Sequence, residues 1–210
     1  MSDAVHSQSL TPQSLTEDIA FIRGLAEEGR KTPYRGGISL AAGLIWGTAS
    51  LYGWAVTAGL WSNPPGGLAS AGWIWLVATM AFAIAGVPLR IYRTGPGCNR
   101  TAAAAWGGVG LACLTVSAGM GLAAWRMHQG AVMALLPPMI MALYGGGWLV
   151  GAVAFRAPWQ RWVGGLCLLS SLVLAYVAAQ PVEYLLFALS LYGLAALPGL
   201  IAVLRPQPNA

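Results

Sequence analysis

Residues able to do acid–base or metal chemistry are scarce in this chain. It has 11 basic residues, six acidic residues, two histidines and three cysteines among 210 residues. Cys98, Cys113 and Cys167 form no CxxC pair, and His6 and His128 lie outside the long apolar segments, so neither a metal site nor a haem site is indicated. Because catalysis needs convergent titratable groups, we expect no enzyme activity and no cofactor.

Three titratable residues are nevertheless expected to share one end of the molecule. Arg126 and His128 follow the third apolar segment, and Glu183 lies between the fifth and the sixth. Glu183 is the only acidic residue beyond the N-terminal region. Two interpretations fit these positions: an ion pair between Glu183 and Arg126 or His128, or a solvated charge at the membrane surface.

The stretch 131–155 combines membrane-spanning length with residues that disturb helices. Its 25 residues carry no charge, which is enough to cross a hydrocarbon core of about 30 Å. The candidate break or substrate path consists of Pro137, Pro138, Tyr144, Gly145, Gly146 and Gly147. A break there would open a path for a substrate, whereas a kink would serve only packing, since neighbouring helices can satisfy the freed carbonyls.

A short amphipathic helix is predicted over residues 14–29, ahead of the apolar segments. Its polar face is acidic and contains Glu17, Asp18, Glu27 and Glu28. Helices that adsorb to anionic lipid normally carry Lys and Arg instead. The helix is therefore expected either to dock on basic cytoplasmic loops of its own chain or to bind a soluble cytoplasmic partner or a membrane complex.

The elements that would carry these residues are six apolar segments. They cover about 38–60, 71–89, 102–124, 131–155, 162–179 and 184–204. The chain is 57% hydrophobic and 8% charged, against roughly 25% charged in soluble domains. The sequence thus predicts an all-α, polytopic integral membrane protein with six transmembrane helices over residues 37–204. Residues 1–36 would form a cytoplasmic segment and residues 205–210 a cytoplasmic tail.

The basic residues indicate how such a chain is oriented. With the N-terminus in the cytoplasm, Arg126 alone falls outside, and the remaining ten basic residues fall inside: Arg23, Arg30, Lys31, Arg35, Arg90, Arg93, Arg100, Arg156, Arg161 and Arg205. This agrees with the positive-inside rule and predicts both termini in the cytoplasm. It also explains the net charge of +5 without nucleic acid. The excess of Arg over Lys favours a bacterial source, and hence the inner membrane.

Small residues and a repeated tripeptide indicate how the helices pack. Ser39, Gly43 and Gly47 are four residues apart, a seam typical of close helix contact in lipid. The tripeptide Leu-Tyr-Gly occurs three times, at Tyr52, Tyr144 and Tyr192. It indicates either an inverted repeat of two three-helix halves or tyrosines that fill space beside glycines. The short loops after the third, fourth and fifth segments predict antiparallel neighbours.

Two classes of function fit this chain. The charge-free spans favour a non-catalytic accessory, anchoring or assembly component of the inner membrane, with the lipid bilayer as its surroundings. The alternative is a transporter, or the membrane subunit of a transport system, for a neutral or apolar substrate, because the spans offer no counter-charge.

Overall fold

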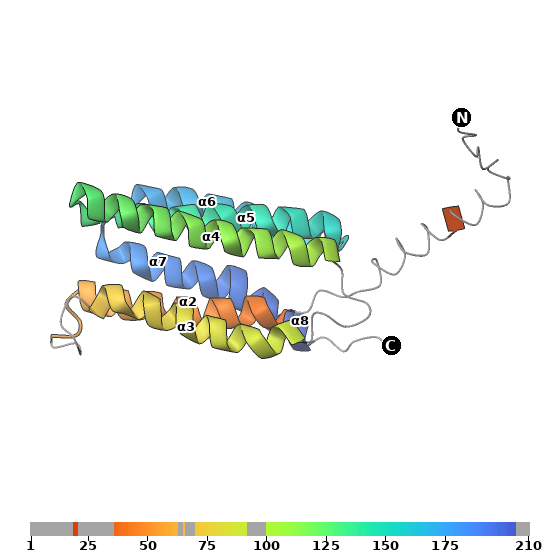
Figure 1. The fold of residues 1–210 in the computed structure, drawn as a ribbon, viewed down its shortest axis with the longest axis horizontal. Coiled ribbons are helices and arrows are strands. Elements are labelled where there is room, and N and C mark those ends of the chain that lie inside the picture. The colour runs from red at the N-terminus through yellow and green to blue at the C-terminus, as the bar shows by residue number, and fades with distance from the viewer. Residues whose placement is uncertain (1–18, 21–35, 63–64, 66–69, 92–99, 205–210) are drawn as a thin grey trace, which may run out of the picture.

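The chain forms a bundle of helices in this computed structural model (Figure 1). The structure describes residues 19–20, 36–62, 65, 70–91 and 100–204. The helices are α2 (Gly37–Thr57), α3 (Ser70–Ile91), α4 (Arg100–Met127), α5 (Leu136–Ala154), α6 (Trp159–Tyr176), α7 (Pro181–Leu191) and α8 (Leu197–Leu204). A 3₁₀ turn, η2 (Gly130–Leu135), precedes α5, and a π-helical turn, η3 (Tyr192–Ala196), joins α7 to α8. These ranges contain no strand, which confirms the predicted all-α class.

Each of the six predicted apolar segments is helical over most of its length. Three continuous helical stretches are long and apolar enough to cross a membrane: Ala104–Met127, Gly130–Ala154 and Pro181–Leu204. Backbone groups must be satisfied internally in lipid, so uninterrupted helices of this length suit a bilayer. Membrane association is thus supported by the structure.

The helices lie in two layers (Figure 1). In the first layer, α2 packs between α3 on one side and α7, η3 and α8 on the other. In the second layer, α5 packs between α4 and α6. The main core cluster joins the layers, since it includes Met141 and Trp148 from α5, Cys167 from α6, and Phe187 and Leu191 from α7.

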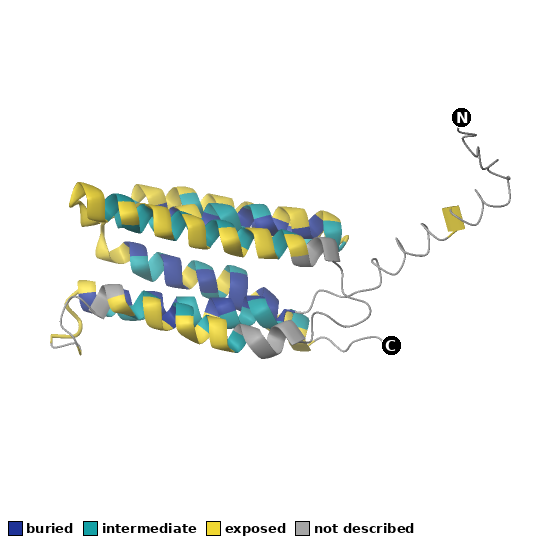
Figure 2. Cartoon of the chain, in the orientation of Figure 1, coloured by how far each residue is buried: buried dark blue, intermediate teal, exposed yellow. Residues whose placement is uncertain are grey.

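Many large apolar side chains face outward in this bundle, and several helix contacts are made by small residues. Figure 2 shows exposed residues along α3 and α4, and buried ones where α2 meets α7 and α8. Leu76 and Met80 of α3 and Leu172 of α6 are exposed, whereas Ala49 and Ala188 are buried. Lipid is as apolar as leucine, so helices in a membrane associate through close contact at small residues. This distribution fits a bundle surrounded by lipid.

The sixth predicted segment is not one regular α-helix. Pro198 has no N–H to donate, and its ring would clash with the carbonyl four residues earlier. The chain widens into η3 just before it, and the Leu197 N–H bonds to the Tyr192 carbonyl, a π-type bond. Proline therefore explains why α7 and α8 are separate elements.

The predicted N-terminal helix falls outside the described residues, except for Ile19 and Ala20, which are helical. Its acidic residues Glu17, Asp18, Glu27 and Glu28 are not described. The tail 205–210 also lies outside the described ranges.

Candidate functional site

The Pro-Pro pair lies where a helix begins. Leu136 is the first residue of α5, so Pro137 and Pro138 fall in its first turn, after the 3₁₀ turn η2. The first N–H groups of a helix have no partner within it, and proline is therefore tolerated there. Ser171 of α6 donates a hydrogen bond to the Pro138 carbonyl at 2.7 Å. The interruption of the fourth segment is thus a helix start tied to α6.

The triple glycine lies within a continuous helix, because α5 runs unbroken from Leu136 to Ala154. A Cβ on Gly145 would stand 3.0 Å from the Gly164 carbonyl oxygen of α6. A Cβ on Gly147 would stand 3.0 Å from a Val109 methyl of α4. Gly146 faces open space. Two of the three glycines therefore allow α4 and α6 to approach α5 closely.

Tyr144 connects the two layers by a chain of hydrogen bonds. Ser39 of α2 donates to the Ala195 carbonyl at 2.9 Å, within the π-helical turn η3. The Tyr144 hydroxyl lies 3.3 Å from Ser39 Oγ. Since the single Ser39 proton is already used, Tyr144 donates to Ser39. The Tyr192 hydroxyl likewise lies 3.0 Å from Thr48 Oγ1 of α2. Two of the three repeated tyrosines thus tie α2 to other helices.

The three residues expected at the outer end do not come together. Arg126 and His128 are exposed, and Glu183 is only 2% exposed. Its Oε2 accepts a hydrogen bond from the Ala179 N–H at 2.8 Å, and its Oε1 is buried without a partner. Within the described ranges, no ion pair joins Glu183 to either base. Glu183 is therefore neither a solvated charge nor half of an ion pair, and it instead holds the turn between α6 and α7.

Gln160 is a buried polar residue that sequence reasoning missed. It is fully buried at the start of α6, and neither its Oε1 nor its Nε2 has a hydrogen-bond partner. The Trp106 Nε1 of α4 is also buried without one. The position of a Cβ on Gly151 would lie 2.8 Å from Gln160 Oε1 and 3.7 Å from Trp106 Nε1. A donor from α4 and an acceptor from α6 thus both lie close to Gly151 of α5.

The sequence does carry a signal for this polar contact. Gln160 is an amide between Trp159 and Arg161, at the edge of an apolar segment. Gly151 lies four residues after Gly147, on the same face of α5. A polar residue opposite a glycine seam is a candidate for contact between helices.

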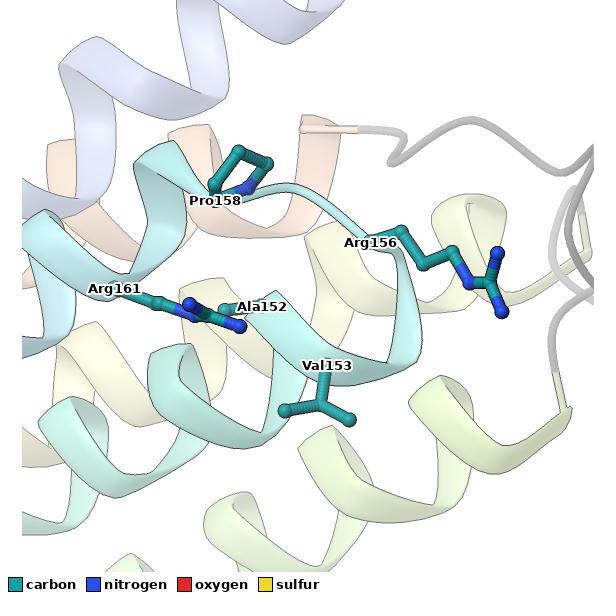
Figure 3. A pocket seen from close by; sticks show the side chains of 5 residues that line it. All are labelled: Ala152, Val153, Arg156, Pro158 and Arg161. Carbon is teal, nitrogen blue, oxygen red and sulfur yellow. The ribbon is translucent and has the colours of Figure 1, made fainter.

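A shallow surface pocket lies at the connection between α5 and α6 (Figure 3). Its volume is about 310 Å³, and it is lined by Ala152, Val153, Arg156, Pro158 and Arg161. A second groove of about 350 Å³ lies between α2 and α3 and is lined mainly by apolar residues, together with Thr48. The first pocket combines charged and apolar groups, whereas the second is suited to apolar contacts.

The chemistry available at these places is hydrogen bonding and charge attraction. No group of three or more His, Cys, Asp or Glu side chains comes together within the described ranges. The predicted path residues, the three titratable residues Arg126, His128 and Glu183, and the pocket at the α5–α6 connection lie in separate parts of the bundle. They do not form one site.

No protein-family model matches the chain, and neither a curated protein nor a solved structure is detectably similar to it.

Proposed function

We propose that this protein is a six-span integral membrane protein of a bacterial inner membrane, with both termini in the cytoplasm. Three helical stretches already have spanning length and apolar composition. The other three predicted segments pack beside them as helices of similar orientation (Figure 1). The placement of ten of the eleven basic residues on one side supports the orientation.

Topology is tested with reporters fused after residues 62, 129 and 204, which lie at the ends of the first, third and sixth predicted spans. A reporter active only outside the cytoplasm should work at 62 and 129 and fail at 204. Activity at 204, or inactivity at 62, would contradict the six-span arrangement.

Within that membrane we propose a non-catalytic accessory, anchoring or assembly role. The supporting observation is the tight packing of α5 at the level of its glycines. Gly145 and Gly147 contact α6 and α4 closely, and Trp148 beside them is fully buried. A substrate path past these residues would need space that the helices fill here. A close-packed bundle suits a component that holds other proteins in place.

Cysteine scanning along α5 tests this packing. Single cysteines replace Ala131, Met141 and Gly147 in a variant whose three native cysteines are changed to alanine. A membrane-impermeant maleimide should label position 131, which is exposed at the end, and not 141 or 147, which are buried. Labelling at 141 and 147 would show a water-reachable path and overturn the accessory role.

The partner is proposed to bind the acidic N-terminal helix. The variant with Glu17, Asp18, Glu27 and Glu28 changed to lysine is compared with the intact chain and with one lacking residues 1–29. Both altered chains should insert normally and lose the same co-purifying protein. Unchanged co-purification would remove the partner from this helix and favour docking on the chain's own loops.

A transporter of a neutral or apolar substrate is the second candidate. One observation supports it: the helix contacts of α2 resemble those of α5. If the first three spans are matched to the last three, α2 corresponds to α5, α3 to α6, and α4 to α7. The contacts of α2 with α3 and α7 then correspond to those of α5 with α6 and α4. Such a relation is typical of inverted repeats in transporters. Reconstituted vesicles that take up a neutral solute only with this protein would support it over the accessory role.

A further inference from the structure

The pocket at the α5–α6 connection is lined by two arginines together with Ala152, Val153 and Pro158. Arg161 extends from α6 toward Ala152, and Arg156 extends outward from the connection (Figure 3). Val153, on the floor, is 70% exposed. The side chain of Trp162, next to Arg161, is 80% exposed. Two cationic side chains and two apolar ones thus line one pocket, and an exposed indole ring follows Arg161 in the sequence.

No described carboxylate neutralises these arginines. Glu183, the one acidic residue in the described ranges, lies at the other end of α6 and is buried. The carboxyl end of α5 carries a partial negative charge that offsets part of the Arg156 charge. The amino end of α6, which follows directly, carries the opposite partial charge. Among the described residues, the positive charges of Arg156 and Arg161 therefore have no carboxylate to offset them.

Arg156 has a backbone conformation that is unusual for a residue with a side chain. Its φ is 51°, in the left-handed region that favours glycine at the residue after a helix. The Ala157 N–H bonds to the Ala152 carbonyl at 3.1 Å, which closes the end of α5. A glycine would fit this turn with less strain. The turn thus presents a cation where the backbone alone would favour a residue without a side chain.

We propose that this pocket binds the phosphate-bearing headgroup of an anionic phospholipid. The Arg161 guanidinium contacts the phosphate, and Arg156, which points outward at the rim, adds a second positive charge beside it. The acyl chains lie along the exposed apolar face of α5 at Val150 and Val153. Basic pockets at the cytoplasmic ends of spanning helices favour such lipids. A volume of about 310 Å³ is at the lower end of the range for small-molecule sites, which suits a headgroup. This inference rests on the membrane embedding proposed above and not on the accessory role.

Lipid binding is measured on the full chain in detergent by native mass spectrometry. Phosphatidylglycerol, phosphatidylcholine and glycerol phosphate are added separately. Phosphatidylglycerol should bind most tightly, because it supplies both the charge and the acyl chains. Each arginine near a membrane surface contributes about 1 kcal/mol, or about a five-fold change in affinity. The double variant R156Q/R161Q should therefore bind phosphatidylglycerol about thirty-fold more weakly.

Two variants make the test specific. R126Q removes the exposed arginine at the other end of the bundle and should leave binding unchanged. R156K/R161K retains both charges and should lose only a small part of the affinity. If R156Q/R161Q elutes as aggregate, the single variant R161Q replaces it, with about a five-fold loss expected.

Three results would overturn the proposal: equal binding of phosphatidylcholine, an equal loss in R126Q, or binding of glycerol phosphate as tight as that of the lipid. The last would assign the pocket to a soluble phosphate compound. If the chain is not embedded in a membrane at all, a separate measurement shows it: the protein would leave the membrane fraction without detergent. Failure of the accessory role would change partner capture and not lipid binding.

Discussion

Replacement of Gly43 by alanine is the sharpest test of how these helices associate. Gly43 lies on the buried face of α2, against the π-helical turn η3. An added Cβ would contact the Ala196 backbone nitrogen, and it would stand 2.7 Å from Ala196 Cβ and 2.8 Å from Ala196 Cα. Real Cβ atoms do not approach so closely, so α2 and η3 would have to separate.

Two opposing effects set the size of the change. Alanine favours a helix over glycine by about 1 kcal/mol, which by itself would stabilise the variant. Overpacking a well-packed interface costs about 1–3 kcal/mol. The upper part of that range applies because two of the three contacted atoms belong to the Ala196 backbone and cannot rotate away. We expect the G43A variant to be less stable by about 1–2 kcal/mol.

Gly119 provides the matched control. It lies in α4, and nothing stands within 4 Å of where its Cβ would be. G119A should therefore gain the stability that alanine gives a helix, without a steric clash. Gly151 lies between these cases, because its Cβ would meet the Gln160 Oε1 at 2.8 Å, and that side chain can rotate. The expected order of stability is G119A, then G151A, then G43A.

The assay is equilibrium unfolding in mixed micelles with a rising fraction of sodium dodecyl sulfate, followed by tryptophan fluorescence. The midpoint should fall for G43A and stay level or rise for G119A. A G43A midpoint at or above that of the unaltered chain would refute the close contact between α2 and η3. Equal shifts of the midpoint in G43A and G119A would show that the contact of Gly43 with Ala196 does not limit stability.

Three further outcomes are expected. E183A should lower stability by about 1.5–3 kcal/mol in the same assay, because it removes the acceptor of the Ala179 N–H. E183Q keeps an acceptor oxygen there and should retain most of the stability of the unaltered chain. S39A should lower stability more than Y144F, since Ser39 makes two hydrogen bonds and Tyr144 only one of them; the reverse order would contradict the bond from Ser39 to the Ala195 carbonyl. Residues 1–129 and 130–210, expressed as two polypeptides, should co-purify, because α2 packs on α7 across the division.

The helices of this fold were predictable because the signal is local. Long apolar segments with charges only at their ends are helical wherever they are described, and their bounds differ by a few residues. At two places the helices differ from the predicted segments, and both places involve proline. The helix α5 begins at Leu136 and not at 131, with Pro137 and Pro138 in its first turn, and Pro198 follows the division of the sixth segment. Proline removes a donor at a known position, so these deviations follow from residues visible in the sequence.

The polar residues of the interior were not predictable in the same way. Glu183 and Gln160 lie at segment ends. The sequence leaves a solvated charge and an ion pair open for Glu183, and it does not single out Gln160. Both are buried, and their burial depends on which helix packs beside them. For Gly147 and Gly151 too, the sequence does not show which helix packs against them. The spacing indicates a seam, but only the packed structure shows that α4 lies against it through Val109 and Trp106.

The turn between α6 and α7 shows why a buried carboxylate is found there. The short connection predicts that these two helices pack as antiparallel neighbours, yet their mutual contact is small and they lie in different layers (Figure 1). The chain therefore has to cross between layers within the residues 177–180. Ala179 adopts a φ of 66° to do so, at a cost of roughly 1–2 kcal/mol for a residue with a Cβ. The Glu183 carboxylate accepts the Ala179 N–H at this strained residue. Burial of Glu183 thus follows from the exchange of helices between layers, and a mutation there should loosen the contact between layers before it unfolds either one.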